Sequence, residues 1–146
     1  MDEKIKKQLI EFQKNEITEY HVYTKLAKRI KGKNGAVLDE IGKDEYKHYN
    51  LMKKYTKIDV EPNKFFIFWY VLLSYIFGLT FALNAMEKGE EKAQVNYEEV
   101  KKYVPEFEDI IKDENEHEKK LLGLIDEEKI NYVSSMVLGF SHEKSG

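Results

Sequence analysis

The stretch LDEIGKDEYKHYNLMKKY, residues 38–55, places an acid and an imidazole on a helical stripe that is otherwise apolar. Apolar residues recur there every three or four positions from Leu38 to Met52, which is the spacing of one helix face. Glu45 and His48 occupy the positions of that face where leucines would be expected. A buried carboxylate is costly unless it is neutral, paired or bound to a cation. The stretch therefore predicts a helix that carries metal ligands toward the core.

A second pair with the same spacing, Glu114 and His117, interrupts the apolar stripe of a helix expected at residues 105–126. Residues three apart share a helix face, so both side chains of each pair can reach one ion. A carboxylate and an imidazole together suit iron, manganese or zinc better than calcium or magnesium.

Carboxylates also interrupt the stripes of the other expected helices. The first runs from about residue 2 to 32, the second from 36 to 56, and the third from 64 to 103 with a bend at Gly78. Their stripe carboxylates are Glu16, Glu19, Glu87 and Glu90. We expect Glu19 to be a ligand, a neighbour of the ligands or the partner of a lysine.

The chain repeats its own pattern. Glu16 precedes Glu45 by 29 residues, Glu87 precedes Glu114 by 27, and the two halves are offset by 71 and 69 residues. One glutamate from each of two helices, plus a Glu-x-x-His pair from each of the other two, is the ligand set of four-helix di-metal carboxylate proteins. We therefore expect an all-α four-helix bundle over residues 1–128, followed by a short helix and a polar tail over residues 129–146.

Composition excludes several alternatives. The 146 residues include 24 basic and 27 acidic ones, for a formal net charge of −3, and no basic face is evident, so nucleic acid is not an expected partner. The chain has no cysteine, which excludes disulfides, thiolate metal sites and cysteine-ligated iron–sulfur clusters. The charged N-terminal stretch does not resemble a secretory signal. These observations together favour a cytoplasmic protein.

The sequence resembles the rubrerythrin branch of the ferritin-like di-iron proteins over residues 5–126. The motifs that carry the resemblance are Glu16 with Tyr23 and Leu26-Ala27, Asp44-Glu45-Tyr46-Lys47-His48, Met86-Glu87-Lys88-Gly89-Glu90 with Ala93 and Tyr97, and Glu114-Asn115-Glu116-His117. The resemblance implies two iron ions per chain, with manganese as an alternative, and a ligand set of Glu16, Glu45, His48, Glu87, Glu114 and His117. It also implies that Glu90 is a further carboxylate ligand, and that Tyr23 and Tyr97 orient the carboxylates. Rubrerythrins carry a cysteine-ligated electron-transfer domain, so in this cysteine-free chain the electron donor would be external.

A second resemblance is to the ferritin-like domain that precedes vacuolar-iron-transporter-type membrane domains. It rests on residues 68–73, 78–80 and 89–94, and on Tyr132-Val133-Ser134-Ser135-Met136-Val137-Leu138-Gly139, which is similar to the opening of the membrane part. The chain then becomes polar and stops at Gly146. We expect either a free-standing relative or a truncated form.

Residues 65–86 carry no charge, and a helix of this length would suffice to cross a bilayer. The alternatives are a fully buried central helix, or a crossover followed by the third helix that another chain covers. We favour a buried or interface helix over a membrane helix, and an apolar surface of this extent favours a homodimer.

The predicted function is that of a di-iron protein that oxidises Fe(II) with O2 or H2O2, as a ferroxidase or a peroxide reductase. The alternative is a non-catalytic iron-binding or iron-sensing module associated with a membrane iron transporter. Acidic residues off the stripes, Asp44 among them, are interpreted as solvated or salt-bridged surface groups.

Overall fold

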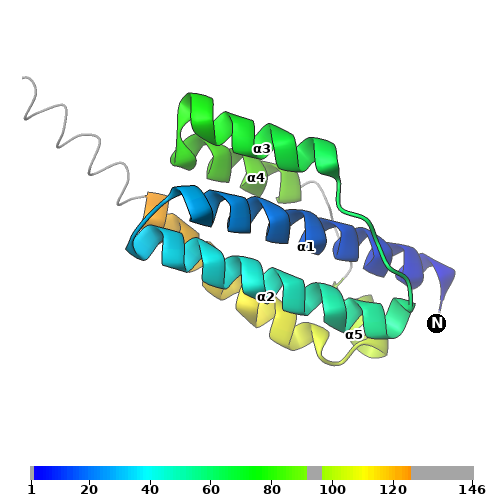
Figure 1. The fold of residues 1–146 in the computed structure, drawn as a ribbon. Coiled ribbons are helices and arrows are strands. Elements are labelled where there is room, and N and C mark those ends of the chain that lie inside the picture. The colour runs from blue at the N-terminus through cyan, green and yellow to red at the C-terminus, as the bar shows by residue number, and fades with distance from the viewer. Residues whose placement is uncertain (1, 92–96, 126–146) are drawn as a thin grey trace, which may run out of the picture.

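The computed structural model describes residues 2–91 and 97–125, except for the side chains of residues 89–91 and 97. Every regular element in these residues is a helix (Figure 1), so the all-α prediction is confirmed. The helices are α1 (Glu3–Arg29), α2 (Lys33–Thr56), α3 (Lys64–Phe77), α4 (Leu79–Glu91), α5 (Tyr97–Tyr103) and a helix over residues 107–125, here called helix 107–125. The short helix and tail predicted for residues 129–146 lie outside the described residues.

The α1–α2 hairpin closely follows its prediction. The Asp2 side chain accepts a hydrogen bond from Lys4 N at 3.1 Å and caps α1, as aspartate commonly does at this position. The chain then reverses within residues 30–32. A Cβ atom on Gly35 would lie 1.8 Å from the carbonyl oxygen of Ile30, so only glycine lets the first turn of α2 pass so close to the end of α1.

The predicted single helix over residues 64–103 is wrong, because the chain there forms three helices. Gly78 has a φ of +93°, in a region that other residues rarely adopt, and its N–H donates to the Ser74 carbonyl at 3.0 Å. The expected bend is therefore a reversal. Helix α3 crosses back along the molecule, and α4 returns beside it in the opposite direction (Figure 1). The crossover followed by a further helix is therefore present, and its coverage by another chain stays a prediction.

The reversal at Gly78 divides the uncharged residues 65–86 between α3 and α4, and α3 is only partly buried. Among the described residues, no helix combines the length and the apolar character needed to cross a membrane. Ile67, Leu73 and Ser74 of α3 are buried, but Phe65 and Phe68 are 67% and 64% exposed. The prediction of a fully buried helix is therefore wrong for the outer side of α3.

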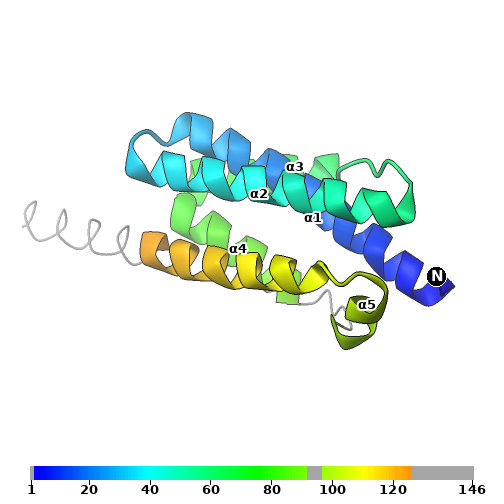
Figure 2. The ribbon, with the colours of Figure 1, turned by 90° about the horizontal axis from the view of Figure 1, so that it is seen from below.

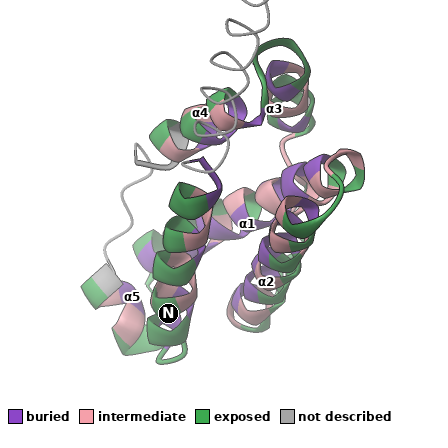
Figure 3. Cartoon of the chain, turned by 90° about the vertical axis from the view of Figure 1, so that its left-hand side faces the viewer, coloured by how far each residue is buried: buried purple, intermediate pink, exposed green. Residues whose placement is uncertain are grey.

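Four helices lie side by side in the body of the molecule. Helices α1 and α2 are antiparallel, α4 runs in the direction of α2, and helix 107–125 runs in the direction of α1 (Figures 1 and 2). Buried residues line the sides of these helices that face one another (Figure 3). Helix 107–125 begins two residues after Pro105, within the uncertainty of any helix boundary.

The core consists of two apolar clusters. One surrounds the C-terminal half of α1 and comprises Val22, Tyr23, Leu26, Leu38, Ile41, Ile67, Leu79, Leu83, Met86, Leu124 and Ile125. The other surrounds its N-terminal half and comprises Ile5, Leu9, Phe12, Met52, Val100, Val104, Phe107 and Ile110. Glu16 lies on α1 between the two and is only 2% exposed. The predicted order along the stripe, apolar, then ionisable, then apolar, is therefore present in the structure.

The connection from α2 to α3 is fastened to α1. Gln13 Nε2 donates to the Ile58 carbonyl at 2.9 Å, and Thr56 Oγ1 donates to Gln13 Oε1 at 2.5 Å. Gln13 is completely buried, so these bonds satisfy an amide that water cannot reach.

Candidate metal centre

Four predicted ligands from three helices meet between the apolar clusters. Glu16 of α1, Glu45 and His48 of α2, and Glu114 of helix 107–125 each offer one ligand atom, and these atoms lie within 4.8 Å of one another. The first three residues are at most 3% exposed, while the Glu114 side chain is 33% exposed. Three carboxylates and an imidazole at this separation form a ligand set suited to a transition metal ion.

His48 is at the centre of this group. Its Nδ1 atom lies 3.3 Å from Glu16 Oε2 and 3.3 Å from Glu114 Oε1. Its Nε2 atom lies 2.8 Å from Asp113 Oδ2. If Asp113 accepts the Nε2 proton, a neutral imidazole keeps its lone pair on Nδ1, the atom that faces the carboxylates and would bind a metal ion.

His117, of the second Glu-x-x-His pair, faces the same group. Glu16, Glu45, His48, Glu114 and His117 are here called the ligand layer. Its Nδ1 atom lies 2.9 Å from Glu45 Oε1, and its ring lies 6.1 Å from that of His48 between centroids, at an interplanar angle of 28°. Its Nε2 atom lies 2.9 Å from Asp44 Oδ2. Both histidines therefore direct Nδ1 inward and hold an aspartate with Nε2.

Several buried polar atoms of the layer form no hydrogen bond. They are both carboxylate oxygens of Glu45, Glu114 Oε1 and His117 Nδ1. The short approach of His117 Nδ1 to Glu45 Oε1 lacks hydrogen-bond geometry and therefore does not satisfy either atom. Buried polar atoms without a partner are rare in folded proteins, and all of these are atoms of the kind that bind metal ions. The residues present therefore fit a bound metal.

The raised pKa values of two residues in the ligand layer indicate that the layer favours added positive charge. Burial raises the pKa of Glu45 well above its usual range, and the neighbouring Glu16 and Glu114 carboxylates raise it further, against an opposing effect of Glu19. Burial alone lowers the pKa of His48, but the close contact with the Glu114 carboxylate, the hydrogen bond with Asp113 and the charges of both outweigh this and raise the pKa overall. Without a cation, the layer thus holds extra protons, and a metal ion would replace them.

The two aspartates were not predicted as part of the site. Asp44 precedes Glu45 on α2 but holds His117 on helix 107–125, while Asp113 precedes Glu114 on helix 107–125 but holds His48 on α2. Asp44 is a partly exposed, ion-paired residue as interpreted, but the sequence did not show that its partner is a predicted ligand, and Asp113 was overlooked. The sequence does contain a signal, because an aspartate stands directly before the glutamate in both pairs.

The remaining predicted residues are placed less directly at the layer. Glu87 is half-buried on α4 and lies outside the four-residue group. Tyr23 is 4% exposed within the apolar cluster around the C-terminal half of α1. The side chains of Glu90 and Tyr97 lie outside the described part of the chain. Glu19 is half-buried, close enough to Glu45 to affect its pKa.

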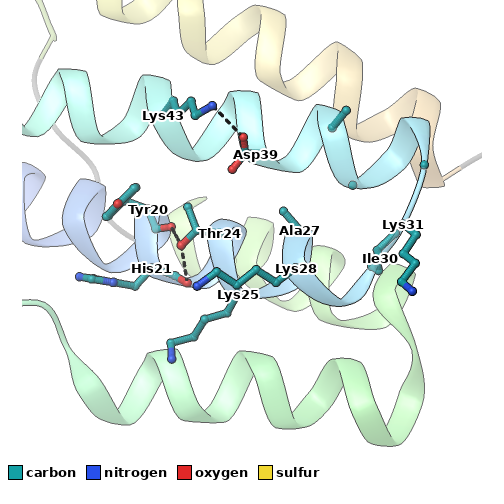
Figure 4. A pocket seen from close by; sticks show the side chains of 13 residues that line it. Tyr20, His21, Thr24, Lys25, Ala27, Lys28, Ile30, Lys31, Asp39 and Lys43 are labelled. Atoms are coloured by element: carbon teal, nitrogen blue, oxygen red, sulfur yellow. Dashed lines mark hydrogen bonds and ion pairs between the residues drawn. The ribbon is translucent and has the colours of Figure 1, made fainter.

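A surface hollow of about 750 Å3 between α1 and α2 is chemically different (Figure 4). Its charged lining includes Lys25, Lys28, Lys31 and Lys43, and its single carboxylate, from Asp39, lies 2.9 Å from Lys43 Nζ. Burial and the charge of Lys25 lower the pKa of His21, another residue of the lining. No member of the metal-ligand group lines this hollow, so the ligand layer is the stronger functional site.

Comparison of the chain with known proteins gives no match to a family model, to a curated protein or to a solved structure. Assignment to the rubrerythrin branch, or to the transporter-associated ferritin-like domains, therefore stays a prediction from the motifs.

Proposed function

We propose that this chain is a ferritin-like di-metal carboxylate protein that binds two iron ions in the Glu/His layer and oxidises Fe(II) with O2 or H2O2. The observation that carries the proposal is the meeting of Glu16, Glu45, His48 and Glu114 within 4.8 Å. Unsatisfied oxygens on Glu45 and Glu114 add to it. Glu45 Oε1 and Glu114 Oε1 each approach a histidine Nδ1 without hydrogen-bond geometry, so the ion pairs alone leave the hydrogen-bonding capacity of these buried atoms unused.

The ligands divide into two positions. Glu16, His48 and Glu114 would hold one ion, and His117 the other, with Glu45 next to both histidines of the layer. On α4, Glu87 and Glu90 are the predicted carboxylates of the second position. This is the distribution of four-helix di-metal proteins, in which two helices each give a Glu-x-x-His pair.

The arrangement of the helices agrees with a ferritin-like bundle. Helices α1 and α2 form one hairpin, and α4 and helix 107–125 form the other, with the crossover α3 between them (Figure 1). The short helix that completes the predicted fold belongs to residues outside the described part.

A bound iron pair supplies two electrons at a time, the number that reduction of H2O2 to water requires. The residues of the chain prepare the site for this chemistry. Asp44 and Asp113 fix the tautomers of His117 and His48, since each accepts the Nε2 proton. The apolar clusters on either side of the layer bury Glu16, Glu45 and His48, while Glu114 is reached by solvent. Because the chain has no cysteine, the electrons that return the site to its reduced state would come from an external donor.

The proposal is tested by anaerobic titration of the metal-free chain with Fe(II), followed by H2O2. We expect two ions per chain, a raised Tm with metal, and rapid conversion of the bound iron to the ferric state, measured by absorbance and by the loss of chelatable Fe(II). Manganese bound in the purified protein, determined by elemental analysis, would identify the other metal that this ligand set accepts.

A matched pair of variants makes the test specific. Glu114→Gln removes a carboxylate of the layer, whereas Glu116→Gln changes an exposed glutamate of the same helix. Only the first should lower the stoichiometry and the oxidation rate. Tight binding of two ions without oxidation would favour the non-catalytic iron-binding module, and a failure to bind any transition metal would refute both functions.

A further inference from the structure

The outer side of α3 exposes a continuous apolar face. Six of its residues, Phe65, Phe68, Trp69, Leu72, Tyr75 and Ile76, follow a spacing of three and four along α3, and the aromatic pair Phe77 and Phe81 stands beside them at the α3–α4 turn; together they are here called the α3 face. Most of them are between 44% and 67% exposed, and Leu72 is half-buried. The sequence from residue 65 to 86 contains no charge to interrupt the face.

Aromatic contacts keep this face ordered. The Phe65 and Trp69 rings are stacked at 6.5 Å with an interplanar angle of 5°, and the Phe77 and Phe81 rings lie 4.8 Å apart across the α3–α4 turn. The guanidinium of Arg29 covers the Tyr75 ring at 3.9 Å. Side chains held in this way lose little conformational entropy when a partner packs on them.

The size of the face distinguishes it from ordinary surface. With roughly 150–250 Å2 for each large aromatic residue, the exposed fractions amount to about 800 Å2. A typical monomer exposes contiguous apolar patches of roughly 300–600 Å2. One side of a standard protein–protein interface covers about 800 Å2, so the α3 face has the area that a stable dimer needs.

We propose that the α3 face is the contact between two copies of this chain, with α3 packing against α3 across a two-fold axis. In such a contact each copy presents the same patch, so the patch must complement itself. The residues of the α3 face meet this condition because none of them is charged, and the Arg29 guanidinium that lies on Tyr75 already packs against an aromatic ring of its own chain.

The composition of α3 argues against a lipid surface as the occupant. Helices that lie in a membrane interface combine an apolar stripe with many lysines and arginines on the polar side. Helix α3 contains a single basic residue, Lys64, and its other side carries the buried Ile67, Leu73 and Ser74.

The test is the mass of the metal-free and metal-loaded protein in solution, by sedimentation velocity from about 1 to 100 µM. We expect twice the chain mass of 17.3 kDa. Phe68→Asp should raise the dissociation constant of the dimer at least about 100-fold, as loss of a central apolar contact does. Leu122→Asp is the control, because Leu122 is a comparably exposed apolar residue on helix 107–125, and it should leave the dimer intact.

A second measurement shows which surface makes the contact. In this cysteine-free chain, Leu72→Cys should form an intermolecular disulfide on mild oxidation, and Leu122→Cys should not. Circular dichroism of Phe68→Asp must show the helix content of the unchanged protein. A monomeric unchanged protein would overturn the proposal, whether or not it co-sediments with phosphatidylcholine–phosphatidylglycerol vesicles. A dimer that Phe68→Asp leaves intact would overturn it equally.

Discussion

The surroundings of His48 and His117 differ, although the two Glu-x-x-His pairs are alike in sequence. His48 Nδ1 faces carboxylates from two other helices, Glu16 on α1 and Glu114 on helix 107–125. His117 Nδ1 approaches one carboxylate, that of Glu45. The position around His48 is therefore formed, whereas the position around His117 has only part of its predicted ligands in place.

The difference follows from the helices that carry the single glutamates. Glu16 lies in the middle of α1, which packs along α2 over many turns, and is buried. Its repeat equivalent, Glu87, lies near the end of the short α4, which begins only at Leu79 after the Gly78 reversal, and is half-buried. A sequence repeat thus conserves the ligand types, while the length of the supporting helix determines how well each ligand is positioned.

Removing the Glu45 carboxylate, which lies beside both histidines, should weaken both positions of the proposed site and so remove the difference between them. For Glu45→Gln we expect at least a ~100-fold loss of affinity for both metal ions, because a neutral amide replaces a buried anionic ligand. The metal-free variant should keep its stability at pH 5, since the raised pKa of Glu45 keeps this carboxyl protonated there. Calorimetric titration and thermal unfolding measure the two effects. Glu40→Gln, an exposed change on the same helix, should alter neither; wild-type affinity in Glu45→Gln would contradict the assignment.

Replacing each histidine separately should show whether the two proposed metal positions differ in affinity. We expect His48→Gln to weaken binding of the first ion about 100-fold, because this side chain lies among the formed group. His117→Gln should change the affinity for the first ion by less than about tenfold and should lower the affinity for the second ion. Competition with a chelator of known affinity resolves the two ions. His21→Gln, in a residue of α1 that lines the lysine-rich hollow (Figure 4), serves as the control, and equal losses in the two histidine variants would show that the positions are equivalent.

Replacing the aspartates that hold the histidines should lower metal affinity in the same pattern, but by a smaller factor. We expect Asp113→Asn to weaken the first ion about tenfold, and Asp44→Asn to weaken the second by a similar factor, since each orients one imidazole. Asp109→Asn changes an exposed residue of helix 107–125 and should have no effect. If Asp113→Asn instead weakened binding of the second ion and Asp44→Asn that of the first, the crossed pairing of aspartates and histidines would be contradicted.

The smallest expected effect is a pH dependence of the metal-free protein. The folded-state pKa values of Glu45 and His48 are both raised. Their contribution to stability is therefore complete below the unfolded values of 4.5 and 6.5 and is lost as the pH rises through the folded values. We expect the Tm to fall by several degrees on going from pH 5 to pH 8, and this fall to be smaller in Glu45→Gln. With metal bound the trend should reverse, because metal displaces these protons. A metal-free Tm that rises over this range would contradict the sign.

The sequence predicts the ligand layer well because the layer depends on local geometry. Spacing of three and four residues places Glu16, Glu45 and His48 on core-facing sides whatever the neighbouring helices do, and all three are buried. Residue spacing does not predict burial correctly where the path of the chain depends on the φ angle of a single residue. Ile76 and Leu79 continue one stripe in the sequence, but the Gly78 reversal separates them, leaving Ile76 60% exposed and Leu79 8% exposed.

Long-range pairing is the other part that sequence spacing does not supply. Asp44 lies beside the stripe of its own helix and therefore reads as a surface residue, yet its partner His117 lies 73 positions away. Only the packing of α2 against helix 107–125 brings the two together. The doubled Asp-Glu-x-x-His pattern indicates that both aspartates share one role, but it does not show which histidine each of them holds.

The crossed aspartates have a consequence for the assembly of the site. The histidine of each hairpin is held by the aspartate of the other. Either hairpin alone would therefore lack a partner for its own histidine, and both imidazoles are held only when the two hairpins pack together. Because the hairpins belong to one polypeptide, that encounter is intramolecular, and the effective concentration of the halves is on the order of millimolar.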